Sequence, residues 1–316
     1  MSGVIGKFVD GIEKWFESVL KDGITSIFEN IGELLQNSFS NDTGKVGSFS
    51  NFINMYLKQH PAHFTGAPDG SGTTIWSTIE GICNNAVVPL AGMILVILLL
   101  NDLIQMCIQG NNMKDFDDSI FIKWIIKALC GVILISNIYY IASGLFSFGV
   151  GATNGAINML FGSGATAISD VTLNKAALNG YGIGTLISVL FLSLFVYLGI
   201  FLMIAVIIVV LASRMIEIFM YLSVAPVPVA TLIDGGEFGS IGKNWIKQLV
   251  ALSFQGFFIV IAIGIFKTIF NNAIESINNT SSNIILQMAI LLGYTFSLMF
   301  TVLRTSAISK SAFNTH

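Results

Sequence analysis

Ionisable side chains inside or beside apolar segments are the residues of this sequence that could do chemistry, because burying a charge in a membrane is costly and usually serves a function. Arg214 and Glu217 lie three residues apart at one end of such a segment, so on a helix they can pair across one turn. A charge-coupled transporter would use a pair of this kind at mid-membrane. Asp102 and Lys267 lie near the ends of other apolar segments, where we expect them to anchor helix ends at the membrane surface.

Motifs for enzymatic chemistry are missing from the sequence. Gly242 and Lys243 are followed by Asn244, and Glu237 occupies the place of the first glycine, so no phosphate-binding loop is formed. The three histidines fall in tail and loop positions, which excludes a Ser/His/Asp or Cys/His set. The three cysteines are far apart, which excludes a disulfide framework and a CxxC metal site. We therefore expect a protein that is not an enzyme and that holds no cofactor or metal.

The composition identifies the solvent of this chain as lipid. Charged residues make up 10% and hydrophobic residues 54% of its 316 residues, with a mean hydropathy of +0.79. A soluble domain carries about 25% charged residues. The net charge of −3 also argues against a basic surface that binds nucleic acid. The sequence therefore predicts an all-α, polytopic membrane protein.

Five apolar stretches are long enough to cross a hydrocarbon core of ~30 Å as helices. They cover residues 86–108, 120–146, 184–212, 248–270 and 284–303. A sixth segment, residues 215–233, contains Pro226 and Pro228, and each proline removes a backbone donor and fixes φ. Non-helical backbone at membrane depth survives only when it is buried in protein or faces water. We interpret this segment as broken or re-entrant, and the alternative is an ordinary kinked span.

The distribution of basic residues favours five spans with an extracytoplasmic amino terminus and a cytoplasmic carboxyl terminus. This arrangement places eight Lys or Arg residues inside and two outside, as the positive-inside rule requires. Six spans with the amino terminus inside would leave almost no bias. The eight inside are Lys114, Lys123, Lys127, Arg214, Lys243, Lys247, Arg304 and Lys310, and the two outside are Lys175 and Lys267.

The amino-terminal region, residues 1–83, differs in character from the transmembrane domain predicted over residues 84–316. Residues 3–38 have apolar side chains at three- and four-residue steps, which predicts one amphipathic helix. Its polar face carries three basic and six acidic residues. That sign is wrong for adhesion to anionic lipid, so we expect the helix to pack against sister subunits or a partner protein. A plain interfacial helix is the alternative.

Three short motifs carry a resemblance to a known family. Residues 221–231 (YLSVAPVPVAT) are followed by a polar turn, by residues 242–248 (GKNWIKQ) and by residues 252–256 (LSFQG), which open the fourth span. This order resembles the TrbL-type, VirB6-like polytopic subunits of conjugative type IV secretion systems. The Phe-Gln-Gly variant resembles those of Gram-positive mobile elements. The candidate structural or functional residues are Arg214, Glu217, Pro226, Pro228, Trp245, Gln255 and Gly256; Trp245 precedes an apolar run, where interfacial tryptophans usually lie.

The resemblance implies a non-enzymatic channel or scaffold subunit that forms a homo-oligomer in the bacterial plasma membrane. It would work beside conjugation ATPases and other secretion subunits to pass relaxase-bound single-stranded DNA. Direct strand binding would need a positively charged groove, which the sequence does not offer at any length. Two other function classes stay open: a small-solute transporter or channel, and a membrane immunity or holin-like protein.

Overall fold

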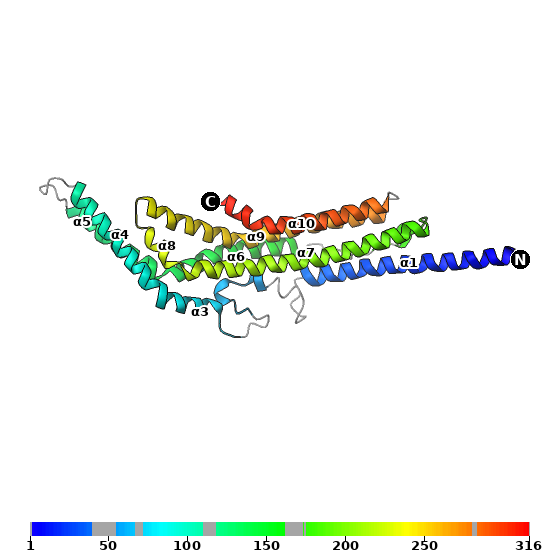
Figure 1. Ribbon diagram of the computed structural model, residues 1–316, viewed down its shortest axis with the longest axis horizontal. Coiled ribbons are helices and arrows are strands. Elements are labelled where there is room, and N and C mark those ends of the chain that lie inside the picture. Colours follow the sequence, from blue (N-terminus) through cyan, green and yellow to red (C-terminus); the bar gives the residue numbers. More distant parts are fainter. Residues whose placement is uncertain are drawn as a thin grey trace. The chain divides into compact units, whose positions relative to one another are not determined.

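The computed structural model describes residues 2–39, 55–66, 72–109, 118–161, 173, 175–279 and 283–315, and these ranges contain helices and no strand. Lys114, one of the residues used to orient the spans, lies outside them. The predicted fold class, an all-α polytopic membrane protein, is confirmed. The elements (Figure 1) are α1 (Ser2–Phe39), η1 (Pro61–His63), α3 (Ile75–Ile82), η2 (Cys83–Val87), α4 (Val88–Gln109), α5 (Asp118–Ser136), α6 (Ile138–Phe161), η3 (Lys175–Leu178), α7 (Ile183–Ser223), α8 (Pro226–Thr231), α9 (Glu237–Asn279) and α10 (Ile284–Ala312).

Four helical segments of the described chain are long and apolar enough to cross a membrane, namely Ile75–Ile108, Ile183–Ser223, Glu237–Asn278 and Ile284–Ala312. The bent pair of α5 and α6 makes a fifth if it counts as one span. Each predicted span therefore has a helical counterpart, but the helices are longer than expected. With 41 and 43 residues, α7 and α9 measure about 60 Å and about 65 Å, roughly twice the hydrocarbon thickness. Part of each must tilt or project beyond the core.

The prediction of one span over residues 120–146 missed a bend at Asn137. Here α5 and α6 meet at 67°. The side-chain amide of Asn137 donates to the carbonyl of Ile133 at 2.9 Å, and the backbone N–H of Asn137 donates to the same carbonyl at 3.1 Å. A side chain that competes for a helix carbonyl disturbs the regular ladder and favours a kink.

The break in the sixth apolar segment lies directly before Pro226, and the first part of the segment belongs to α7. Residues 215–223 continue α7 without interruption, and the helix ends only at the turn formed by Val224 and Ala225. The apolar residues before the turn favour helix as strongly as those of the preceding span, so the helix runs on until the prolines stop it. The twin-proline part forms the separate short helix α8.

The chain divides into two compact units, each assembled from three stretches. Unit 1 contains residues 1–54, 155–211 and 258–305, and unit 2 contains residues 55–154, 212–257 and 306–316. In unit 1 the amphipathic helix α1 buries one side of its second half, including Ile24, Phe28 and Ile31. In unit 2 Trp76 packs edge-on against Tyr139 and Phe146, with ring centroids 5.6 Å and 6.3 Å away.

Tyr139, at the start of α6, also joins α6 to the end of α7. Its hydroxyl donates to the carbonyl of Leu222 at 3.0 Å, and the carbonyl of Ile79 lies at 3.4 Å from the same oxygen. The side chain is buried, so water does not compete for these contacts. Tyr139 therefore holds together three segments that are distant in the sequence.

We expect Tyr139→Phe to lower the free energy of unfolding by about 0.5–1.5 kcal/mol, the usual net value of one intramolecular hydrogen bond. The measurement is thermal unfolding of the purified protein in mild detergent. Tyr140→Phe is the matched control, because the neighbouring ring is 83% exposed. Equal melting temperatures for the two variants would contradict the role given to Tyr139.

Candidate functional site

Arg214 is the centre of a polar junction inside unit 2. Its side chain lies on α7, is only 3% exposed, and reaches the backbone of α9. Nε donates to the carbonyl of Leu252 at 2.9 Å, and Nη2 donates to the carbonyl of Ser253 at 3.1 Å. Nη1 lies 3.5 Å from the carbonyl of Tyr56. The guanidinium thus joins α7, α9 and the segment before η1 through backbone oxygens.

Gly256 makes this close approach possible. A Cβ atom placed on Gly256 would lie 2.8 Å from Nη1 and 3.1 Å from Cζ of Arg214. Real Cβ atoms do not come this near to a buried, hydrogen-bonded guanidinium, so any larger residue would push Arg214 away from α9. The contact with Arg214 on α7 therefore explains why the LSFQG motif has glycine at position 256.

Helix α6 also packs against this motif, at Ser253. Ser253 Oγ donates to the carbonyl of Leu145 at 3.1 Å. A Cβ atom on Gly149 would lie 2.5 Å from the carbonyl oxygen of Ser253, so only glycine fits where α6 crosses α9. Sequence reasoning missed Gly149, Leu145 and Ser253 as members of this junction. Neither periodicity nor charge distinguishes Gly149 and Ser253 from other small residues of an apolar helix, and Leu145 takes part only through its backbone carbonyl.

Glu217 has a different partner from the one predicted. Its carboxylate forms an ion pair with Lys310 of α10 at 3.2 Å, and both side chains are about one-third exposed. The predicted pairing of Arg214 with Glu217 is therefore wrong. Residues three apart on a helix point about 60° from each other, so the two side chains can face different neighbours. Here Arg214 faces α9 while Glu217 faces α10.

Gln255 and Trp245 are both buried in α9 and contribute polar atoms without a described partner. Gln255 Oε1 and Trp245 Nε1 make no hydrogen bond among the residues that the structure describes. Trp245 belongs to the apolar core of unit 2 with Leu249 and Leu252. Tertiary packing leaves the side chain only 6% exposed, and the interfacial position of Trp245 stays a prediction.

The two prolines lie where a helix tolerates them. Pro226 is the first residue of α8 and Pro228 the third, and both are buried. The amides of the first turn have no intrahelical acceptor, so proline removes donors that would otherwise need partners. Thr231 Oγ1 donates to the carbonyl of Pro228 at 2.7 Å and accepts from the amide of Gly242 at 3.1 Å. This links α8 to the GKNWIKQ motif at the start of α9.

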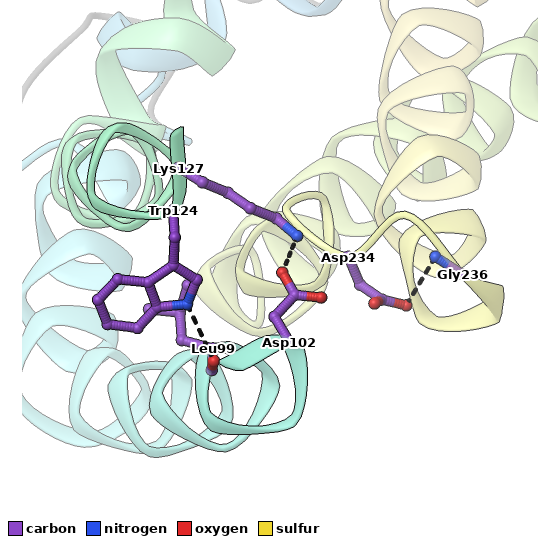
Figure 2. Close-up of polar contacts among 6 residues, drawn as sticks. All are labelled: Leu99, Asp102, Trp124, Lys127, Asp234 and Gly236. Carbon is purple, nitrogen blue, oxygen red and sulfur yellow. Dashed lines mark hydrogen bonds and ion pairs between the residues drawn. The ribbon is translucent and has the colours of Figure 1, made fainter. Parts of the chain in front are cut away.

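Charged side chains of α4 and α5 lie beside the turn that follows α8 (Figure 2). Lys127 of α5 forms an ion pair with Asp102 of α4. One turn earlier, Trp124 Nε1 donates to the carbonyl of Leu99 at 3.1 Å. In the turn itself, Asp234 Oδ2 accepts from the amide of Gly236 at 3.1 Å. These contacts hold α4 and α5 together, and the expectation that Asp102 anchors a helix end at the membrane surface stays a prediction.

Lys267 plays a similar role in unit 1. The side chain is buried, and Nζ donates to the carbonyl of Leu160 near the end of α6 at 2.9 Å. The amine of Lys267 thus contacts the backbone of α6, and the expectation that it lies at the membrane surface stays a prediction. Arg214 and Lys267 are the two buried basic side chains of the described chain, and each donates to the backbone of a neighbouring helix.

The segment before η1 is held to α6 by His60. Nε2 lies 3.0 Å from the carbonyl of Ser143, and Nδ1 accepts from the amide of Ala62 at 3.1 Å. An acceptor at Nδ1 assigns the proton to Nε2, so the neutral ring satisfies both contacts. Burial lowers the pKa of His60; the contact with Ser143 opposes this, and neighbouring His63 lowers the pKa further.

The contacts described above form a set of helix-to-helix connections. Within the described ranges, no group of three His, Cys, Asp or Glu side chains is close enough to hold a metal ion. Arg214, Ser253 and Lys267 each donate to a backbone carbonyl of a neighbouring helix. Chemically, such a site can fix helix positions.

Comparison with known proteins gives one family. A family model described as TrbL/VirB6 plasmid conjugal transfer like protein matches residues 53–226, more than half of the chain. No curated protein and no solved structure matches. The matched range contains Arg214, Glu217 and Pro226 but ends before α9, so the GKNWIKQ and LSFQG motifs lie beyond it.

Gly256→Ala should destabilise the protein by about 1–3 kcal/mol, the usual cost of overpacking a buried contact. The reason is the displacement of Arg214 from the carbonyls of Leu252 and Ser253. Melting temperature in detergent measures the effect. Gly144→Ala on α6 is the matched control: nothing lies within 4 Å of its added Cβ, so helix propensity alone predicts a gain of up to about 1 kcal/mol. If Gly256→Ala were as stable as the control, Arg214 would not need the glycine.

Acidification should release residues 55–66 from α6. Because the pKa of His60 is lowered in the folded chain, stability from the neutral ring is complete above its ordinary pKa of 6.5 and falls as the pH drops below it. We expect faster limited proteolysis in this segment at about pH 5 than at about pH 7.5. His60→Gln should abolish the difference, whereas His63→Gln should retain it. A difference that survives in His60→Gln would assign the effect to another group.

Proposed function

Because the chain belongs to the TrbL/VirB6 family of plasmid conjugal transfer like proteins, we propose that it is a non-enzymatic channel or scaffold subunit of a conjugative type IV secretion machine. It is a multi-pass membrane protein of a conjugal transfer family. In this proposal the protein lies in the plasma membrane, with its amino terminus on the extracytoplasmic side and its carboxyl terminus in the cytoplasm.

The observation that favours a scaffold over a transporter is the use of the buried basic residues. In a transporter, charged groups within the membrane line the path of a substrate or ion. Here Arg214 and Lys267 donate to carbonyls of neighbouring helices and so support the packing of α6, α7 and α9. Glu217, the acidic candidate for a coupling site, pairs with Lys310 at a partly exposed position.

The partners in this proposal are other copies of the chain and the other subunits of the machine, including the conjugation ATPases. The ATPases supply the energy of transfer, since the sequence lacks a nucleotide-binding loop. Relaxase-bound single-stranded DNA would pass through or along the assembly. An origin in a Gram-positive mobile element remains a prediction from Phe254, Gln255 and Gly256, which lie outside the range that the family model matches.

Deleting the gene should abolish conjugative transfer while donor growth stays normal, and the intact gene supplied in trans should restore transfer. Mating frequency, counted as transconjugants per donor, is the measurement. Complementation with Gly144→Ala should succeed, whereas Gly256→Ala should restore transfer only partly because the Arg214 junction is weakened.

Two results would point elsewhere. Normal transfer after deletion would overturn the proposed function. Ligand-dependent flux in liposomes that Glu217→Gln removes would favour the small-solute transporter instead.

A further inference from the structure

The first half of α1 carries an apolar stripe that the described part of the chain leaves uncovered. Phe8, Ile12 and Trp15 are 70%, 51% and 65% exposed. Three more apolar side chains of the same half are also exposed: Val9, Phe16 and Val19. From Leu20 onward the same helix is packed into unit 1. One continuous helix therefore has a packed half and a free half.

The packed half is fixed at its beginning by polar contacts with the segment before α7. Asp22 forms an ion pair with Lys175, and Lys21 Nζ donates to the side chain of Asn179 at 3.4 Å. A Cβ on Gly23 would lie 3.4 Å from the side chain of Leu190 on α7. In Figure 1 the free half of α1 extends past the start of α7. Because α1 is unbroken, residues 2–19 form an arm about 27 Å long.

The apolar stripe has the spacing of a helix bundle. Phe8, Ile12, Trp15 and Val19 follow one another at steps of four, three and four residues, which is the heptad repeat of helices that coil around each other. Val9 and Phe16 widen the stripe beyond a narrow two-helix seam. The charged residues of the arm all fall outside it: Lys7, Asp10, Glu13, Lys14 and Glu17. Identical arms placed in parallel would thus meet through an uncharged seam.

Lipid does not fit the arm as well as protein does. Helices that lie on anionic membranes carry Lys and Arg on the polar face, whereas this arm has three acidic and two basic residues. The arm continues the packed half of α1 as one unbroken helix. Since all copies in one membrane share the same orientation, their arms point to the same side.

We propose that the free half of α1, residues 2–19, docks against the same segment of other copies of this chain and forms a parallel helix bundle. The proposal rests on the homo-oligomeric part of the proposed function and not on DNA transfer. It identifies Phe8, Ile12, Trp15 and Val19 as the seam between subunits.

Cysteine crosslinking of the full-length protein in mild detergent tests the seam. The two exposed cysteines are first removed by Cys107→Ser and Cys130→Ser, and buried Cys83 is retained. Ile12→Cys places a thiol in the seam, and Glu13→Cys places one on the outer face as the matched control. A disulfide needs Cα atoms within about 7 Å, so oxidation should give about tenfold more covalent dimer from Ile12→Cys than from Glu13→Cys.

A second substitution separates the seam from chance collision. Adding Trp15→Glu to Ile12→Cys should lower the dimer yield to that of Glu13→Cys, whereas adding Lys14→Gln should leave it unchanged. Both side chains are exposed, so the helical circular dichroism of the variants should match the parent.

Three results would overturn the proposal. Equal yields at positions 12 and 13 would deny the seam, as would no dimer at either position. Protection of Ile12→Cys from a thiol reagent only in vesicles of anionic lipid would assign the stripe to lipid. Normal transfer after gene deletion would instead overturn the proposed function and leave the crosslinking result standing.

Discussion

Arg214 donates hydrogen bonds directly to the backbone of α9, and the organisation of unit 2 depends on that contact. A buried cation that has no acidic partner among the described residues must find oxygens that can share its charge, and the carbonyls of Leu252 and Ser253 provide them. The contact requires a bare patch of helix, which Gly256 supplies. It also brings the neighbouring hydroxyl of Ser253 into reach of α6. Three helices therefore meet at one turn of α9.

The residue types of the LSFQG motif are explained by contacts with other helices and not by its local sequence. Leu252 and Ser253 offer carbonyls to Arg214, and the ring of Phe254 lies 5.4 Å from that of Phe313 near the end of α10. Gln255 is buried, and Gly256 leaves room for the guanidinium. The motif thus contacts α7 through Leu252, Ser253 and Gly256, α6 through Ser253 and the end of α10 through Phe254, which is typical of a helix enclosed on several sides. The family assignment rests on other residues, since the matched range ends at Pro226.

Much of the fold could be predicted because lipid imposes a simple rule on sequence. Apolar runs such as residues 248–270 must be helices, and Pro226 and Pro228 must interrupt one. The site could be predicted only in part. Arg214 and Gly256 were identified as candidates, but their contact joins residues 42 positions apart, and no local pattern encodes it. The pairing of Arg214 with Glu217 followed from local spacing, and the arrangement of α9 and α10 overrode it. The bend at Asn137 arises from one side-chain hydrogen bond within an ordinary apolar run.

The prolines of α8 have a consequence for how this chain can turn around inside an apolar environment. A helix start exposes amide hydrogens that lipid cannot solvate, and each costs several kcal/mol when it is left bare. Pro226 and Pro228 carry no such hydrogen, and the amide between them, on Val227, donates to the carbonyl of Val224 at 3.1 Å. The residue type that breaks most membrane helices here makes a new helix start compatible with a dry interior.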